Sequence, residues 1–185
     1  MGSESQPRQA NQTCCASRVM IAPRMWGMLL RPTEVDDLDV FLCWVHDEEA
    51  MVLWSGPTFS WPLDRLQLDE YFSDPHRQYW TGIDGVTGAA VGHASLLFDD
   101  GLSCRLGFVI LNPSRRGEGL GRKMVSQLMA MLIETMTELT LGVYSHNIPA
   151  RRLYESLGFR GCETVLQTPM GDQVWNVVAM SHDLR

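Results

Sequence analysis

A short, basic, glycine-rich segment is the part of the sequence best suited to chemistry. It reads RRGEGLGR over residues 115–122 and lies between an apolar run and a long amphipathic pattern. That order predicts a strand, a tight loop and a helix. The alternating glycines leave backbone N–H groups open to a ligand, and such groups at a helix N-terminus bind anions. Together with the cations Arg115, Arg116, Arg122 and Lys123, the loop predicts a pyrophosphate site.

Two better-known phosphate loops do not fit this segment. The P-loop requires a Lys-Ser or Lys-Thr pair that closes GxxxxGK[ST], and the dinucleotide fingerprint requires GxGxxG. The third glycine position of that fingerprint falls on Arg122 when it is counted from Gly117, and on Met124 when it is counted from Gly119. The pattern that remains is Arg116-x-x-Gly119-x-Gly121. A tight turn that binds nothing is the alternative.

A second motif follows about thirty residues later. An apolar run over residues 139–144 predicts a buried strand, and the pattern Asn147-x-x-Ala150-x-x-x-Tyr154 comes after it. Pro149 suits the first turn of a helix, and Gly158 suits its end. A tyrosine hydroxyl can act as a general acid. Packing of Tyr154 against a sheet is the alternative.

Taken together, the two motifs resemble the acetyl-CoA-binding motifs of the GCN5-related N-acetyltransferases (GNAT superfamily). The resemblance covers residues 26–185, and its specificity is concentrated in residues 111–159. It implies an α/β fold with a central, mostly antiparallel, twisted sheet that has a V-shaped splay and is flanked by about four helices. It also implies transfer of an acetyl group from acetyl-CoA to an amine by direct attack in a ternary complex, without a metal.

The resemblance also implies roles for individual residues. The pantetheine arm of acetyl-CoA would occupy the opening between the strand that ends at Leu111 and the strand that ends at Tyr144. Tyr154 would protonate the leaving thiolate as general acid. The residues implied in cofactor binding are Val109, Ile110, Leu111, Arg116, Gly117, Glu118, Gly119, Leu120, Gly121, Arg122, Asn147 and Tyr154.

The general base is less defined by the sequence. Many family members carry a glutamate on the strand that corresponds to residues 102–111, but this strand reads CRLGF over residues 104–108 and has no carboxylate. His93 on the preceding run is a candidate, because histidine titrates near pH 6.5, and a structural role is its alternative. Glu118 is expected to be solvated. A water chain, or an amine that arrives neutral, would serve as well.

Composition limits the classes of partner. The chain has 185 residues, of which 45% are hydrophobic, and this suffices for one core. Its formal charge of -7 disfavours nucleic acid or an anionic membrane as the main partner. No stretch resembles a signal peptide or a membrane span. Five cysteines at irregular spacing predict reduced thiols in a cytoplasmic protein.

The order of patterns predicts a polar, flexible arm over residues 1–24 and a single domain over residues 25–185. A short strand over 28–31 is followed by helices over 35–45 and 63–72, where tryptophans could wall an acceptor pocket or simply pack. An antiparallel meander is expected next. Its strands cover 79–83, 89–98 and 102–111, a helix with apolar residues from 120 to 139 follows, and the last strands lie near 163–167 and 173–182.

Two alternatives to an N-acetyltransferase stay open at this point. One is a CoA-binding regulatory or interaction module without turnover, and the other is a transferase of a longer acyl chain. The acceptor is also open: a protein N-terminus, a lysine, a polyamine, an antibiotic or a small metabolite. A homodimer is possible.

Overall fold

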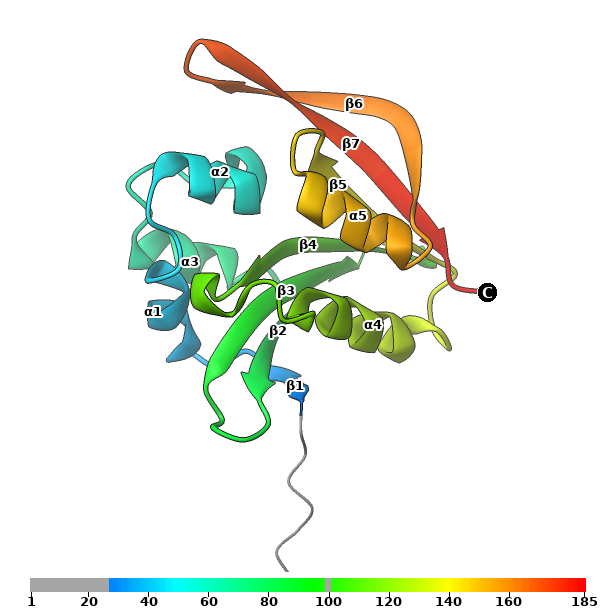
Figure 1. Cartoon of the computed structure of the whole chain (residues 1–185), viewed down its shortest axis with the longest axis horizontal. Helices are drawn as coiled ribbons and strands as arrows, with labels where there is room; N and C mark the ends of the chain where they lie inside the picture. The colour runs from blue at the N-terminus through cyan, green and yellow to red at the C-terminus, as the bar shows by residue number, and fades with distance from the viewer. Residues whose placement is uncertain (1–26, 99–100) are drawn as a thin grey trace, which may run out of the picture.

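The computed structural model describes residues 27–98 and 101–185, and for residues 162–165 it describes the backbone only. The arm expected over residues 1–24 lies outside the described residues. The fold is a seven-stranded sheet in the order β1-β2-β3-β4-β5-β7-β6 with helices on both faces (Figure 1). The predicted α/β fold with a mostly antiparallel sheet is confirmed.

The first half of the chain forms β1 (Met28–Pro32), α1 (Asp37–Leu42), α2 (Glu48–Ser55), a 3-10 turn η1 (Gly56–Thr58), α3 (Arg65–Tyr71), β2 (Arg77–Asp84) and β3 (Ala90–Phe98). The second half forms β4 (Ser103–Leu111), a 3-10 turn η2 (Pro113–Arg115), α4 (Leu120–Leu132), β5 (Glu138–Tyr144), α5 (Ile148–Ser156), β6 (Arg160–Met170) and β7 (Gln173–Asp183). No described helix is long and apolar enough to cross a membrane.

The centre of the sheet contains the V-shaped splay. Strands β2, β3 and β4 form the predicted antiparallel meander. Strand β5 then pairs with β4 in parallel, but only from Ser103 opposite Glu138 to Leu106 opposite Leu141. Beyond this ladder the two strands continue without pairing to each other. The sheet is therefore open between the C-terminal halves of β4 and β5.

A β-bulge bends β4 where the opening begins. His93 lies opposite Ile110, whereas Ser95 lies opposite Gly107, so β4 has one residue more than β3 in this stretch. Phe108 takes a φ of 53°, which is uncommon for a residue with a Cβ. The indole N–H of Trp54 on α2 donates to the Phe108 carbonyl at 2.8 Å. Because bulges bend the strand that carries them, this contact holds β4 in the direction that keeps the opening.

Each face of the sheet is covered by its own group of helices. Helices α4 and α5 pack with Leu96 and Leu106 in one apolar cluster. Helices α1, α2 and α3 pack with Phe108 and Ile110 in another. Figure 1 shows α4 and α5 next to each other, and α1 to α3 grouped apart from them. The opening between β4 and β5 therefore lies between two helical layers.

Three element boundaries differ from the prediction. The helix expected over residues 35–45 is shorter, as α1 ends at Leu42. Helix α2 was not predicted, so the described residues form five α-helices rather than about four; it begins after Asp47, whose side chain caps it by accepting from the Ala50 N–H at 2.7 Å. The helical pattern from residue 120 ends at Leu132, and Leu139 belongs to β5. Strand β6 begins at residue 160, before the predicted start at 163.

A buried carboxylate joins the first elements to the sheet. Asp37, at the start of α1, accepts hydrogen bonds from both terminal nitrogens of Arg31, at 2.6 and 2.8 Å. It also accepts from the Thr81 hydroxyl at 2.8 Å and from the Glu34 N–H at 2.9 Å. Burial alone would raise the pKa of Asp37, but these hydrogen bonds outweigh burial and lower it below its ordinary value. Strands β1 and β2 are thus tied to α1.

We expect Asp37→Ala to reduce the free energy of unfolding by about 2–4 kcal/mol, because it leaves the half-buried Arg31 guanidinium without its partner. Asp39→Ala is the matched control, since Asp39 is 70% exposed and pairs with Arg65 at 2.7 Å. An exposed ion pair of this kind contributes less than about 1 kcal/mol. Urea titrations at pH 7 measure both values.

The pH dependence gives an independent check of this network. Folding lowers the pKa of Asp37, so the ionised carboxylate stabilises the folded state. This contribution is complete above about pH 4, the pKa of Asp37 in the unfolded chain. It is lost as the pH falls through the pKa of Asp37 in the folded state. The difference between wild type and Asp37→Ala should therefore shrink in acid. Equal costs for the two alanine variants at pH 7 would show that the network contributes no more than a surface pair.

Candidate active site

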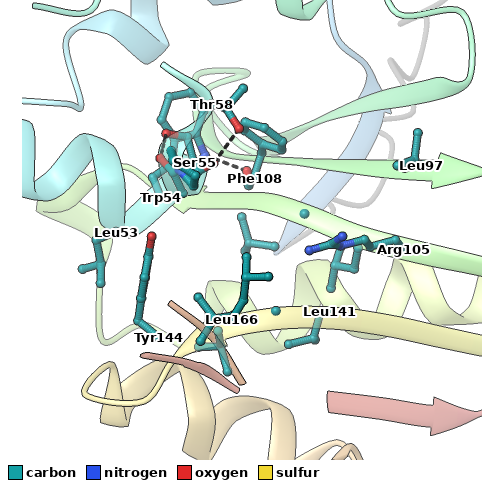
Figure 2. Close-up of a pocket in the computed structure, with 18 of the residues that line it drawn as sticks. Leu53, Trp54, Ser55, Thr58, Leu97, Arg105, Phe108, Leu141, Tyr144 and Leu166 are labelled. Atoms are coloured by element: carbon teal, nitrogen blue, oxygen red, sulfur yellow. Dashed lines mark hydrogen bonds between the residues drawn. The ribbon is translucent and has the colours of Figure 1, made fainter. Parts of the chain in front are cut away.

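A cavity of about 460 Å³ lies where β4 and β5 separate (Figure 2). Its walls come from both layers of helices and from the C-terminal hairpin. The lining includes residues 53–58 of α2 and η1, Glu70, Tyr71, Asp74 and Arg77, residues 105–109 of β4, residues 141–144 of β5, Asn147, Ala150 and Tyr154, and Leu166, Thr168 and Val177. The opening in the sheet is therefore a continuous site reached from both faces.

Tyr154 lines this cavity from α5, as the second motif predicts. The residue is 6% exposed, and its hydroxyl has no hydrogen-bond partner in the described part of the chain. Its ring lies edge-on to Phe159, with centroids 5.7 Å apart. Burial raises the pKa of Tyr154 above its ordinary value. The phenol is therefore protonated at neutral pH and able to donate into the cavity.

The side chain of Asn147 uses its carbonyl in a hydrogen bond within the protein and leaves its NH₂ group for a ligand. Its side-chain carbonyl accepts from the Ala150 N–H at 3.3 Å and so caps α5. The residue also lines the cavity. Its amide NH₂ group has no hydrogen-bond partner among the described residues, so this group remains for a ligand carbonyl.

The glycine-rich loop leads into α4, and its glycines have different roles. Gly117 and Gly119 have φ values of 83° and 76°, and a Cβ at either position would meet nothing within 4 Å. Conformation rather than crowding therefore requires these two glycines. Gly121 is different, because a Cβ there would lie 3.2 Å from a Leu153 methyl group on α5. This glycine lets α4 approach α5.

Some charged side chains of the loop form ion pairs within the protein, and others are exposed to solvent. Arg115 pairs with Glu118 at 2.7 Å and with Asp84 at 3.2 Å. These contacts raise the pKa of Arg115 and lower the pKa of Glu118. The Arg115 guanidinium is thus already paired with carboxylates of the protein. The Glu118 carboxylate is paired as well, so only the backbone N–H of Glu118 is left for an anion. Arg116, Arg122 and Lys123 are exposed.

The residues implied in cofactor binding fall into two places. Val109, Asn147 and Tyr154 line the cavity. Ile110 is buried under α1 to α3, and the loop over 116–122 lies outside the cavity lining. Arg122 on α4 donates to the Ser156 carbonyl at 3.2 Å. The loop is therefore next to α5, although it forms no wall of the cavity.

His93 is part of the aromatic core. It is fully buried, with its ring centroid 4.6 Å from that of Phe41 and its Nε2 3.5 Å from the Tyr71 hydroxyl. Burial lowers the pKa of His93 to about 3. The residue is absent from the cavity lining. The structural alternative is thus favoured over a role as general base.

Four charged residues of the cavity were not predicted as site residues. Glu70 and Asp74 come from the end of α3, Arg77 begins β2, and Arg105 lies on β4. No spacing in the sequence connects them, because only packing of α3 on the sheet brings them together. The described residues contain no cluster of three or more His, Cys, Asp or Glu that could hold a metal ion.

Comparison with known proteins supports the interpretation of the motifs. A curated UPF0039 protein of Schizosaccharomyces pombe is 31% identical over 77 residues, which cover 42% of this chain and 51% of that protein. This chain therefore matches about half the length of that relative.

Solved acetyltransferase structures share the fold. The spermidine N-acetyltransferase of Vibrio cholerae, solved with CoA and spermine, superposes with a TM-score of 0.72 at 19% identity and covers 85% of this chain and 95% of its own. The Brucella melitensis ribosomal-protein-alanine N-acetyltransferase gives 0.67 at 19% identity, covering 84% and 99%. The Salmonella typhimurium protein yncA, solved with acetyl-CoA, gives 0.65 at 20% identity, covering 86% and 95%.

The sequence family is the stronger finding. The model of the acetyltransferase (GNAT) family matches residues 44–159, which is more than half of the chain. This range contains the glycine-rich loop, the bulged strand and Tyr154. The chain belongs to the acetyltransferase (GNAT) family.

Proposed function

We propose that this protein is an N-acetyltransferase that moves the acetyl group of acetyl-CoA to an acceptor amine by direct attack in a ternary complex. The observation that carries the proposal is the cavity at the opening of the sheet, with the unpartnered, protonated Tyr154 hydroxyl in its wall. A module that only bound CoA would need the opening and the loop, but not a proton donor buried beside them.

The opening suits the extended pantetheine arm of the cofactor. Beyond Leu106, the edge of β4 that faces β5 has no strand partner among the described residues. Backbone N–H and C=O groups on such an edge can pair with amides of a ligand, as they would with a strand. Val109 lies on this edge, and the Asn147 amide faces the same space from α5.

The loop before α4 suits the pyrophosphate of the cofactor. Gly119 caps α4 in a left-handed conformation, and the N–H groups of Leu120, Gly121 and Arg122 begin the helix without helical acceptors. Those groups and the positive end of the helix dipole favour an anion. Similar proteins solved with CoA or acetyl-CoA support this assignment.

The reaction places specific demands on Tyr154. The amine nitrogen attacks the thioester carbonyl, the C–N bond forms, the C–S bond breaks, and the CoA sulfur leaves with the bonding electrons. The amine loses a proton to water, and the sulfur gains one. Burial disfavours a tyrosinate and a thiolate alike. The phenol can therefore donate a hydrogen bond to the departing sulfur and transfer its proton as the thiol forms. Tyr154 then regains a proton from the water that took up the amine proton, which restores the neutral phenol.

Acetyl-CoA should raise the melting temperature of the wild type by roughly 5–10 °C at a hundred times its dissociation constant. Gly119→Val should remove most of this shift, because a β-branched residue opposes the left-handed backbone from which α4 presents its N–H groups. Gly171→Val is the matched control, since Gly171 also has a positive φ, of 55°, but lies in the turn between β6 and β7. Thermal scans with acetyl-CoA, ATP and NAD measure the effect.

The control separates general strain from loss of the site. Both valine variants should melt below the wild type without ligand, but only Gly119→Val should lose its response to acetyl-CoA. A wild-type protein that does not respond to millimolar acetyl-CoA would contradict the cofactor assignment.

Tyr154→Phe should lower kcat by about a hundredfold to ten-thousandfold, the usual contribution of general acid catalysis. Acetyl-CoA affinity should change little, because the hydroxyl acts on a thiolate that exists only late in the reaction. Tyr79→Phe is the control, because Tyr79 does not itself line the cavity and the variant also removes a hydroxyl that donates a hydrogen bond, here to the backbone carbonyl of the lining residue Tyr71. Steady-state kinetics and calorimetry with CoA give the two quantities.

The pH profile of the same variants tests the electrostatics. Since burial raises the pKa of Tyr154 above 10, the wild-type rate should show no alkaline limb from this residue below that pH. Full turnover by Tyr154→Phe with a rate-limiting chemical step would show that Tyr154 is a packing residue.

A further inference from the structure

An unpaired arginine lies in the wall of the cavity. Arg105 is exposed, and in the described ranges its guanidinium forms no hydrogen bond and no ion pair. A Cβ at Gly142 of β5 would lie 3.5 Å from Arg105 Nη2, so this guanidinium reaches from the paired part of β4 to the residue of β5 at which the opening begins. Figure 2 shows it beside Leu141, directed toward the other side chains of the cavity.

A second arginine lies on the same wall and is held in place. The Arg77 side chain is 14% exposed and donates to the Ser95 hydroxyl at 3.1 Å. Its Cζ lies 5.1 Å from the centroid of the Phe108 ring. Asp74 lies 3.5 Å from Arg77 Nε, within ion-pair distance, but this nitrogen makes no hydrogen bond.

Arg105 is on β4, and the Arg77 guanidinium lies beside Gly107 of the same strand. Arg77 Nη1 is 3.8 Å from the position that a Cβ of Gly107 would occupy. Residues 105 and 107 are two apart on one strand, and therefore share a face about 7 Å apart. This part of the wall is positively charged, on the strand where the sequence lacks the glutamate that many family members carry.

The opposite charge in the cavity comes from α3. Asp74 is paired with Arg77, whereas the Glu70 carboxylate has no ion-pair or hydrogen-bond partner among the described residues. The cavity thus has one unpaired anion, Glu70, and one unpaired cation, Arg105. Its other lining residues include the polar side chains Ser55, Thr58, Asn147 and Thr168 and the apolar side chains Leu53, Trp54 and Phe108.

On the basis of the proposed function, we propose that the acceptor is a zwitterion of the amino-acid type, whose anionic group binds Arg105 and whose ammonium group is attracted by Glu70. A guanidinium presents a fork of N–H donors that matches a carboxylate or a phosphate. The same group repels a polycation, so a polyamine is disfavoured. An apolar side chain between the two charged groups would contact the aromatic wall.

The test compares amines that differ only in the acidic group. L-phenylalanine is paired with phenethylamine, and L-methionine with 3-(methylthio)propylamine, while spermidine represents polyamines. β-Alanine and O-phosphoethanolamine distinguish a carboxylate from a phosphate. CoA release should show a kcat/KM that is about tenfold to a hundredfold higher for the acidic member of each matched pair, with spermidine a poor acceptor.

Variants of Arg105 and Glu70 test which side chain causes the preference for acidic acceptors. Arg105→Gln should raise KM for the acidic members about tenfold to a hundredfold and leave the partners that lack the acidic group nearly unchanged, because it removes binding that ground state and transition state share. Arg105→Glu should have a larger effect on the acids and improve spermidine. Glu70→Gln should weaken both members of a pair equally, since both carry the ammonium group. Arg160→Gln, at an exposed arginine outside the cavity, is the control.

The results separate this inference from the proposed function. Equal use of both members of each pair, a preference for spermidine, or equal loss with both members in Arg105→Gln would overturn the zwitterion assignment while acetyl transfer stands. Absence of turnover with every amine would overturn the acetyltransferase proposal. Calorimetry of L-phenylalanine into the CoA-loaded protein then decides the inference: binding that Arg105→Gln removes supports it, and binding that is absent or unchanged contradicts it.

Discussion

The separation of β4 from β5 is the constraint on which the site depends. A central strand normally has its backbone groups paired on both sides, but the parallel ladder stops at Leu106 and Leu141. The bulge at Phe108, fixed by the Trp54 indole, maintains the bend in β4. The resulting edge is a template for an extended ligand with amide groups. Because the two helical layers cover opposite faces, residues from both layers line this one opening.

Features encoded by short-range chemistry could be predicted from the sequence. The loop needs glycines because Gly117 and Gly119 have a left-handed backbone, and α5 begins where Asn147 can cap it. The meander was predictable from its turn residues, and Tyr154 from its helical distance to the cap. Such signals act within a few residues. The resemblance to a family suggested roles for these elements, and the family match confirms the family itself.

The rest depends on contacts between residues distant in sequence. Arg115 was predicted as one cation of the loop, but its position is set by Asp84, thirty-one residues earlier. His93 had a suitable ordinary pKa, and only its burial beneath Phe41 changes that value. Glu70 and Arg77 come to line the same cavity only when α3 packs beside β4. The start of α2 at Asp47 is different, because its capping signal is local and was available in the sequence.

Local charge, rather than net charge, should determine which acceptors are used. A chain with a formal charge of -7 attracts cationic amines from solution in general. That attraction is screened beyond about 8–10 Å at physiological salt. Inside the cavity, a bound acceptor lies within a few ångströms of side-chain charges, where the effective dielectric is lower and each charge acts more strongly. Arg105 therefore opposes locally what the whole surface favours, and selectivity against polycations requires only the few side chains that face the opening between β4 and β5.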